Sequence, residues 1–201
     1  MSPSLLLATT NPGKIREIQG ILAGLPITLV TLEQFPDITE PEETGHTFAE
    51  NARLKALSYA EQTGVAAVAD DSGIEIAALD NAPGVHSARW HGSDYPTKFQ
   101  AIYGELAGRG QRGSAARFVA HVAVARDGQI LFEACGTIEG EIAPAPRGAH
   151  GFGYDPIFFY PPYGCTLGEV DSAKKAAVSH RGKAFRQLRD WLDSGGDARL
   201  Q

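Results

Sequence analysis

The spacing of hydrophobic and polar residues predicts strands and helices that alternate along the first third of the chain. Short apolar runs at residues 4–8, 27–32 and 65–69 are typical of buried strands. Apolar residues three and four apart predict helices between them, one after Pro12 and one over residues 47–62. This alternation is typical of an α/β protein.

The remaining two thirds continue with a helix, a hairpin and a closing helix. Residues 95–106 have helical periodicity. Residues 118–125 and 129–135 alternate as strands around Asp127-Gly128, a dipeptide that favours a tight hairpin turn. An amphipathic helix is predicted to follow Ser179 and to end at Gly195-Gly196.

Two adjacent carboxylates follow the strand at residues 65–69. We expect Asp70 and Asp71 at its end, with Ser72 and Gly73 turning the chain. Adjacent carboxylates disfavour each other's ionisation, and a bound cation removes that cost. The alternative is a solvated turn in which these side chains cap backbone amides.

The loop before the first helix carries the residue types that bind phosphate. Asn11 is a good N-cap, Pro12 suits the first helical position, and Lys14 then lies in the first turn. A cation there opposes the helix dipole, and a bound anion would remove the conflict. The loop is not a Walker motif, and capping alone is the other interpretation.

The closing helix repeats this electrostatic conflict. Ser179 is a natural N-cap, which puts His180 and Arg181 in the first turn. Two such conflicts in one chain suggest a shared negative or acceptor-rich ligand.

A glycine-rich loop surrounds Phe152. Gly151 and Gly153 would let a flat ring approach the backbone, and Asp155 could accept hydrogen bonds from ring N–H groups. The loop precedes Pro156 and a strand instead of opening a helix, so it is no dinucleotide fingerprint. A nucleobase slot and a plain tight loop both remain open.

Composition narrows the class of protein. The 201 residues suffice for one large domain or a two-lobed unit, and 43% hydrophobic with 21% charged residues is ordinary for a globular protein. A net charge of -6 argues against nonspecific binding to nucleic acid. Two isolated cysteines, and no signal core or membrane span, lead us to expect a cytoplasmic protein without membrane partners.

Six segments appear in an order that resembles one family. They are Thr9-Thr-Asn-x-Gly-Lys14, Glu42-Glu43-Thr-Gly, Phe48-x-Glu-Asn-Ala-x-x-Lys55-Ala, Ala69-Asp-Asp-Ser-Gly73, Gly151-Phe-Gly-Tyr-Asp-Pro156 and Ser179-His-Arg-Gly182. The chain resembles the inosine/xanthosine triphosphate pyrophosphatase family, the Ham1/RdgB-like nucleotide house-cleaning enzymes. The resemblance runs from residue 4 to about residue 193.

The resemblance implies a fold and an activity. Members of the family hydrolyse the non-canonical purine nucleotides ITP, dITP and XTP to the monophosphate and pyrophosphate, and they use Mg²⁺. The implied fold is an elongated, two-lobed α/β structure with a mixed sheet and flanking helices. We therefore expect one domain over residues 1–201 and a homodimer.

The resemblance also implies roles for individual residues. Asp71 would activate water, and Glu42 with Asp71 would hold Mg²⁺. Phosphates would be bound by the loop and a lysine on the next helix, namely Thr9, Thr10, Asn11, Pro12, Gly13, Lys14 and Lys55. Phe152 would stack on the base, and the other nucleotide contacts would come from Ser72, Gly153, Tyr154, Asp155, Lys175, His180 and Arg181.

Three other functions compete with this one. A Maf-like pyrophosphatase would act on pyrimidine or modified nucleotides. A phosphatase of the haloacid dehalogenase type would need a DxD motif after the first strand, and residues 5–14 contain no Asp. A nucleotide sensor could lose its water-positioning carboxylate, yet Asp71 and Glu42 are both present.

Overall fold

The computed structural model describes residues 2–201. Within them the chain forms a seven-stranded sheet in the order β2-β1-β3-β4-β5-β6-β7, with five α-helices. The strands are β1 (Ser4–Leu7), β2 (Thr28–Thr31), β3 (Ala66–Ile76), β4 (Ala115–Arg126), β5 (Gln129–Ile142), β6 (Phe158–Tyr160) and β7 (Cys165–Thr166). The helices are α1 (Pro12–Leu22), α2 (Phe48–Thr63), α3 (Tyr95–Gly108), α4 (Ser172–Val178) and α5 (His180–Asp193).

The chain divides into two compact units. Unit 1 contains the chain up to Asp71, Ala120–Gly136 and Arg181–Gln201. Unit 2 contains Ser72–Val119 and Thr137–His180. The two divisions that matter for the site fall between Asp71 and Ser72 and between His180 and Arg181.

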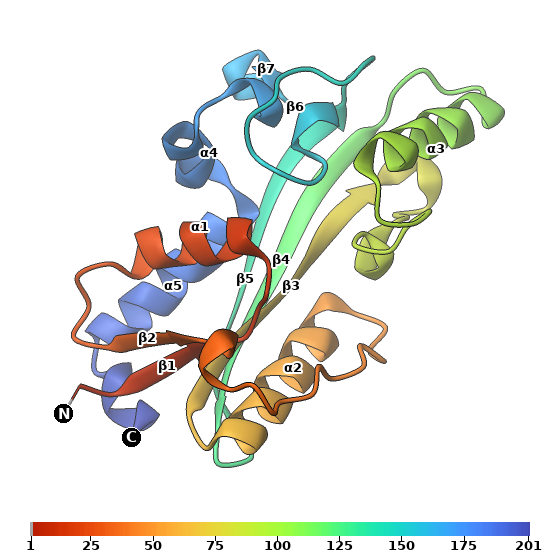
Figure 1. Cartoon of the computed structure of the whole chain (residues 1–201). Coiled ribbons are helices and arrows are strands. Elements are labelled where there is room, and N and C mark those ends of the chain that lie inside the picture. The colour runs from red at the N-terminus through yellow and green to blue at the C-terminus, as the bar shows by residue number, and fades with distance from the viewer. Residues whose placement is uncertain (1) are drawn as a thin grey trace. The chain divides into compact units, whose positions relative to one another are not determined.

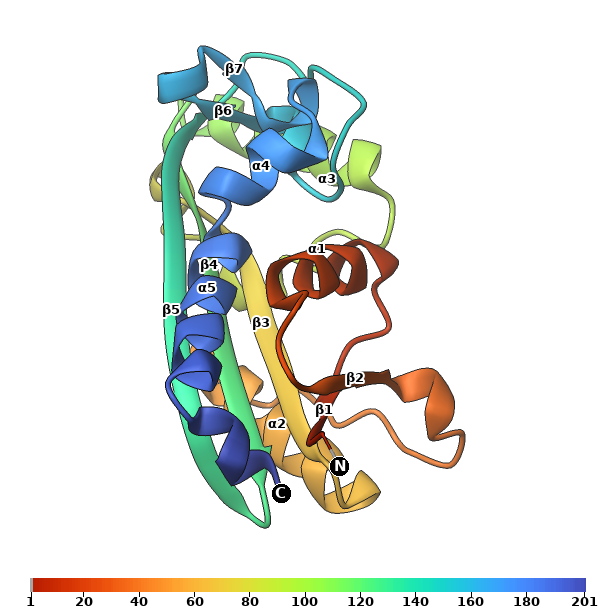
Figure 2. The same cartoon turned by 90° about the vertical axis from the view of Figure 1, so that its left-hand side faces the viewer.

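Unit 1 is a three-layered α/β arrangement around β1. This strand pairs in parallel with β2 and with β3, and helices cover both of its faces (Figures 1 and 2). Leu5 and Leu7 pack with residues of α1 and α5, whereas Leu6 and Ala8 pack with residues of α2. Alternate side chains of a strand point to opposite faces, so burial of both faces explains the continuous apolar run.

Unit 2 has its own hydrophobic core. Ile74 and Ile76 of β3 pack with Ile102 of α3 and with β6. Phe118 of β4 lies 4.4 Å from Phe158 of β6, measured between ring centroids. The antiparallel pairs β5–β6 and β6–β7 complete the sheet and make it mixed, as expected for the fold class.

The turn predicted at Ser72-Gly73 is wrong. Strand β3 continues without interruption to Ile76, and β4 lies beside it. The parallel neighbour β1 ends earlier, because its last pairing joins Leu7 to Val68. Asp70 and Asp71 therefore lie beyond the end of a neighbouring strand and not at the end of their own.

The predicted hairpin differs less from the observed structure. The turn at Asp127-Gly128 has positive φ at both residues, as the dipeptide predicted. The strands around it extend past residues 118 and 135, to Ala115 and Ile142.

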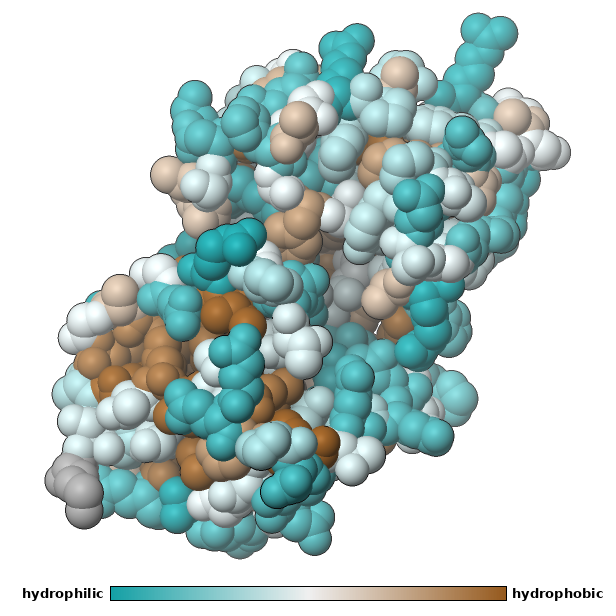
Figure 3. Space-filling model, viewed as in Figure 1, coloured by the Kyte–Doolittle hydropathy of each residue, from teal (hydrophilic) through white to brown (hydrophobic). Residues whose placement is uncertain are grey.

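Hydrophobic side chains gather over α1 and β2 in the view of Figure 3. Ile21, Ile27 and Leu29 are partly buried against the unit 1 core. None of the helices formed by residues 2–201 has both the length and the hydrophobicity needed to span a bilayer.

Candidate active site

The loop from Thr9 to Lys14 caps α1 with its own side chains. Asn11 is the N-cap, and its side-chain oxygen accepts from the backbone N–H of Gly13 at 2.9 Å and of Lys14 at 3.2 Å. Pro12 opens the helix, as predicted. An incoming phosphate would have to compete with Asn11 for these two amides, while the Thr10 side chain is exposed beside them.

Four charged residues of unit 1 form what we call the Asp70 cluster: Lys14, Glu17, Asp70 and Arg181. Asp70 lies 3.0 Å from Lys14 Nζ and accepts from Arg181 Nε at 3.1 Å. Arg181 also pairs with Glu17 at 3.0 Å. The two cations that oppose their helix dipoles thus share one internal carboxylate, so those positions do not by themselves require a ligand.

Asp70 is held in its ionised form. Burial alone would raise the pKa of Asp70, but Lys14 and Arg181 outweigh it and hold the pKa well below the ordinary value. Burial lowers the pKa of Lys14, although Asp70 opposes this shift. The side chains of Asp70 and Arg181 are 1% and 3% exposed, so water screens their attraction very little.

A second group of four residues of unit 1 forms the Asp71 cluster: Glu43, Asn51, Lys55 and Asp71. Lys55 Nζ lies 2.7 Å from Glu43 and 3.2 Å from Asp71 Oδ1. The amide of Asn51 donates to Asp71 Oδ2 at 3.1 Å. Asn51 and Lys55 are one turn apart on α2, and the side chains of both contact Asp71.

Asp71 differs from its neighbour in the direction of its pKa shift. Burial is the largest influence and raises the pKa of Asp71, and the negative charge of Glu43 raises it further. Lys55 and the Asn51 hydrogen bond act in the opposite direction but do not cancel these effects. A carboxylate with a raised pKa is a better proton acceptor than an ordinary aspartate.

The donor set of the Asp71 cluster suits a hard divalent cation. The carboxylate oxygens of Asp71 and Glu43 are the ligand type that Mg²⁺ prefers, whereas the side-chain oxygen of Asn51 accepts from the backbone N–H of Gly45 at 2.8 Å. Residues 2–201 contain no group of three or more His, Cys, Asp or Glu side chains that could enclose a metal. Mg²⁺ is usually bound by one or two carboxylates together with substrate phosphates.

Glu42, predicted as a metal ligand, is exposed, whereas its neighbour Glu43 is half-buried and faces Lys55. Sequence reasoning marked the Glu42-Glu43 pair but could not tell which side chain turns inward. The role of Glu42 as a metal ligand stays a prediction. Glu43 is a second candidate for that role.

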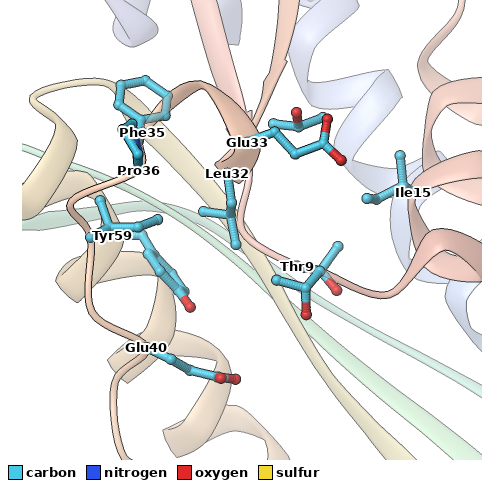
Figure 4. Close-up of a pocket in the computed structure, with 11 residues that line it drawn as sticks. Thr9, Ile15, Leu32, Glu33, Phe35, Pro36, Glu40 and Tyr59 are labelled. Carbon is cyan, nitrogen blue, oxygen red and sulfur yellow. The ribbon is translucent and has the colours of Figure 1, made fainter.

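A pocket of about 330 Å³ adjoins the phosphate loop within unit 1. Thr9, Ile15, Leu32 and Tyr59 are among its lining residues, and Figure 4 shows them around the opening. Its acidic members are Glu33 and Glu40. Thr9 and Thr10 line the pocket, which places the two predicted phosphate-binding hydroxyls at a cavity.

In unit 2 three predicted base-binding residues contact one another: Phe152 and Asp155 of the glycine-rich loop and Lys175 of α4. Asp155 accepts from the backbone N–H of Phe152 at 2.7 Å and pairs with Lys175. Lys175 Nζ lies 4.0 Å from the centroid of the Phe152 ring, a cation–π contact. A Cβ on Gly151 would stand 2.1 Å from an Asp155 oxygen, so this turn requires glycine.

The other predicted nucleotide contacts have different surroundings. His180 is buried and stacks on Phe118, with ring centroids 4.8 Å apart. Tyr154 is also buried, and its hydroxyl donates to the carbonyl of Ser87 at 2.7 Å. Gly153 has positive φ, and Ser72 is half-buried within β3.

Sequence reasoning did not assign roles to Glu17, Glu43 or Ser87. Glu17 follows Lys14 by three residues on α1, a spacing that places both on one helix face. The approach of Arg181 to that face joins residues 164 positions apart, which no local pattern reveals.

Comparison with known proteins agrees with this fold. Residues 5–191 match the Ham1 family, and the chain belongs to that family. It is 45% identical over 190 residues to a dITP/XTP pyrophosphatase of Geobacter sulfurreducens, covering 94% of this chain and 96% of the relative. It is 47% identical over 184 residues to one of Gloeobacter violaceus, covering 92% and 91%.

Solved structures lead to the same family. A HAM1 protein from Coxiella burnetii superimposes with a TM-score of 0.89 at 40% identity, over 96% of this chain and 99% of that one. The Ham1 protein of Staphylococcus aureus superimposes with a TM-score of 0.84 at 33% identity, again over 96% and 99%.

Proposed function

We propose that this protein is a nucleoside triphosphate pyrophosphatase that converts ITP, dITP and XTP to the monophosphate and pyrophosphate. The single observation that carries the proposal is the Asp71 cluster, with a buried carboxylate of raised pKa beside Lys55 and Glu43. Family membership and relatives named dITP/XTP pyrophosphatases support the same reaction.

We assign phosphate recognition to residues of unit 1. Lys14 and Lys55 supply positive charge, and Thr9 and Thr10 supply hydroxyl donors beside the N-terminus of α1. A triphosphate carries charge that must be neutralised before a nucleophile can approach the α-phosphorus. A phosphate would compete with Asp70 and Glu43 for the two lysines, so substrate would rearrange existing ion pairs.

We assign proton acceptance to Asp71. Its carboxylate is fixed by Lys55 on one oxygen and by Asn51 on the other, which orients it for a water molecule. Mg²⁺, when bound, would neutralise phosphate charge and acidify water, and Asp71 with Glu43 or Glu42 would hold it. Asp71 would then align the water and accept its proton.

We assign base recognition to residues of unit 2. Lys175 lies over the Phe152 ring and positions that ring for stacking on a purine. Lys175 and His180 can donate to the 6-oxo group of hypoxanthine and xanthine. Adenine presents an amino donor there, which would leave a buried donor unpaired at a cost of about 1–3 kcal/mol. Arg181, also predicted to read the base edge, donates to Asp70 and Glu17 in this structure.

Guanine poses a separate problem of discrimination. It carries the same 6-oxo group, so its rejection must depend on the 2-amino group. Xanthine has an acceptor at that position, which indicates that the protein places a group there that disfavours a hydrogen-bond donor.

Analysis of the reaction products tests the proposed reaction. We expect XTP incubated with the protein and Mg²⁺ to yield XMP and pyrophosphate in equal amounts. The two products are measured by ³¹P NMR. Asp71→Asn should lower kcat by about 10²–10⁴-fold, the usual contribution of a positioned acid or base. Release of orthophosphate, or an Asp71→Asn variant with wild-type turnover, would contradict the assignment.

We also propose a homodimer that acts in the cytoplasm. The dimer rests on resemblance to the family, and light scattering should give twice the 21.4 kDa of one chain. Cytoplasmic location fits a substrate drawn from the nucleotide pool.

A further inference from the structure

Lys98 is a buried cation that the proposed mechanism does not use. It lies on α3 with only 1% of its surface exposed, among the largest fully buried side chains of the protein. Among residues 2–201 no carboxylate pairs with its ammonium group. An apolar side chain of similar volume would avoid the desolvation cost of a buried charge, so packing alone does not explain a lysine here.

The partners of Lys98 are carbonyl oxygens and aromatic rings. Its Nζ donates to the backbone carbonyls of Ser87 at 3.2 Å and Ala88 at 2.6 Å. It also lies 4.6 Å from the centroid of the Tyr95 ring. These groups compensate the buried ammonium by hydrogen bonding and cation–π attraction. Burial lowers the pKa of Lys98, and no carboxylate opposes this shift.

Ser87 connects Lys98 to two other parts of unit 2. Its carbonyl oxygen accepts from both Lys98 and the Tyr154 hydroxyl, the latter at 2.7 Å. Its own hydroxyl accepts from the backbone N–H of Ile74 at 2.9 Å and donates to the carbonyl of Gly84 at 2.6 Å. One residue thus ties α3, β3 and the loop that contains Phe152.

Tyr154 transmits this arrangement to the candidate base-binding residues. It follows Phe152 by two positions and precedes Asp155, which accepts from the Phe152 N–H. Its ring meets the Tyr95 ring edge-on at 5.3 Å, and Tyr95 also lies beneath the Lys98 ammonium. Two contacts of the Tyr154 side chain, with Ser87 and with Tyr95, therefore lead back to Lys98.

We propose that Lys98 is a positioning residue that fixes Phe152 and Asp155 for purine recognition, acting through Ser87 and Tyr154. The proposal rests on the assignment of base recognition to Phe152 and Lys175. It separates base binding from chemistry, because none of these contacts involves the Asp71 cluster.

Steady-state kinetics of Lys98→Met with ITP and ATP test this role. Methionine keeps much of the side-chain volume and removes the ammonium group. We expect KM for ITP to rise about tenfold with kcat changed less than about twofold, and the preference for ITP over ATP to fall, because the lost interaction is a hydrogen bond to a charged group. Lys174→Met is the matched control, since it makes the same change at an exposed position of α4.

Tyr154→Phe tests the route of the effect and replaces Lys98→Met if that variant does not fold. It removes only the hydroxyl that reaches Ser87, so we expect a smaller rise in KM for ITP at constant kcat. In the double variant the two effects should not add, because both act through one carbonyl.

Three results would overturn the role of Lys98: unchanged KM and base preference in folded Lys98→Met, a fall in kcat alone, or unchanged KM in Tyr154→Phe. Wild-type protein that cleaves neither ITP nor XTP would instead refute the proposed function itself.

Discussion

Asp70 and Asp71 are adjacent in sequence, yet their carboxyl groups have opposite pKa shifts. Both are buried, and burial favours the neutral form of each. Asp70 faces Lys14 and Arg181, which outweigh its burial, whereas Asp71 shares Lys55 with a second carboxylate. Successive residues of a strand point to opposite faces, so continuation of β3 through both residues gives each its own surroundings. The pair therefore combines one carboxylate held ionised by two cations with one carboxyl group whose pKa is raised.

Direct titration of Asp71 tests the causes given for its raised pKa. In metal-free protein, Glu43→Gln should lower the pKa of Asp71, because it removes a neighbouring negative charge. Lys55→Met should raise the pKa, because it removes the cation that opposes burial. Carboxyl ¹³C NMR measures both shifts, and movement in the same direction in the two variants would contradict the described contacts.

The stability of the protein should depend on the charge of Asp70. The pKa of this residue is depressed in the folded state, so its contribution is present above the ordinary value of 3.8 and is lost as pH falls below it. Asp70→Asn leaves Lys14 and Arg181 without their shared carboxylate and should lower the free energy of unfolding by about 3–5 kcal/mol at pH 7.

Urea denaturation at pH 7 and at pH 3 checks this expectation. The difference between wild type and Asp70→Asn should be smaller at pH 3, where the wild-type protein has begun to lose the contribution. Asp37→Asn, at an exposed position, is the control and should change stability little at either pH. A difference of equal size at both pH values would exclude the proposed linkage.

At the scale of elements, two glycines differ in how much space surrounds the position that a Cβ atom would occupy. A Cβ on Gly73 of β3 would lie 2.3 Å from Ser87 Oγ and 2.6 Å from the carbonyl oxygen of Gly84. A Cβ on Gly104 of α3 would meet nothing within 4 Å. The first glycine permits the approach of the Ser87 loop to β3, and the second serves no such contact.

The two glycines predict opposite effects of alanine. Gly73→Ala should lower the free energy of unfolding by about 1–3 kcal/mol, because backbone and serine must move apart. Gly104→Ala should raise it by up to about 1 kcal/mol, the helix-propensity difference. Thermal and urea denaturation of both variants measure this, and a Gly73→Ala variant as stable as wild type would contradict the contact at Ser87.

Local sequence patterns predicted most of the helices and strands, but not where every strand ends. The capping box of α2 is present, with Glu50 N–H donating to Thr47 and the Glu50 side chain accepting in return. The Asn11 cap of α1 formed as expected. The Asp-Asp-Ser-Gly segment was misjudged because its residues favour turns, whereas pairing with a neighbouring strand decided its conformation.

At the scale of the whole molecule, the sequence predicted the family and the types of residue at the site better than their partners. The segments around Lys14, Lys55 and Asp71 stood out in the sequence, and Lys175 was named from the family resemblance. Their pairing with Asp70, Glu43 and Asp155 depends on long-range folding, which spacing along the chain does not encode. Lys98 was missed because a lysine on a helix usually lies at the surface.

Base selectivity of pyrophosphate release tests the central claim most directly. The measurement compares ITP, XTP, GTP, ATP and dTTP, each with Mg²⁺ and with EDTA. The account predicts metal-dependent turnover of ITP and XTP, with the other nucleotides at least about a hundredfold slower. Preferential turnover of dTTP would contradict it in favour of a Maf-like activity, and tight binding of ITP without pyrophosphate release would contradict it in favour of a sensor.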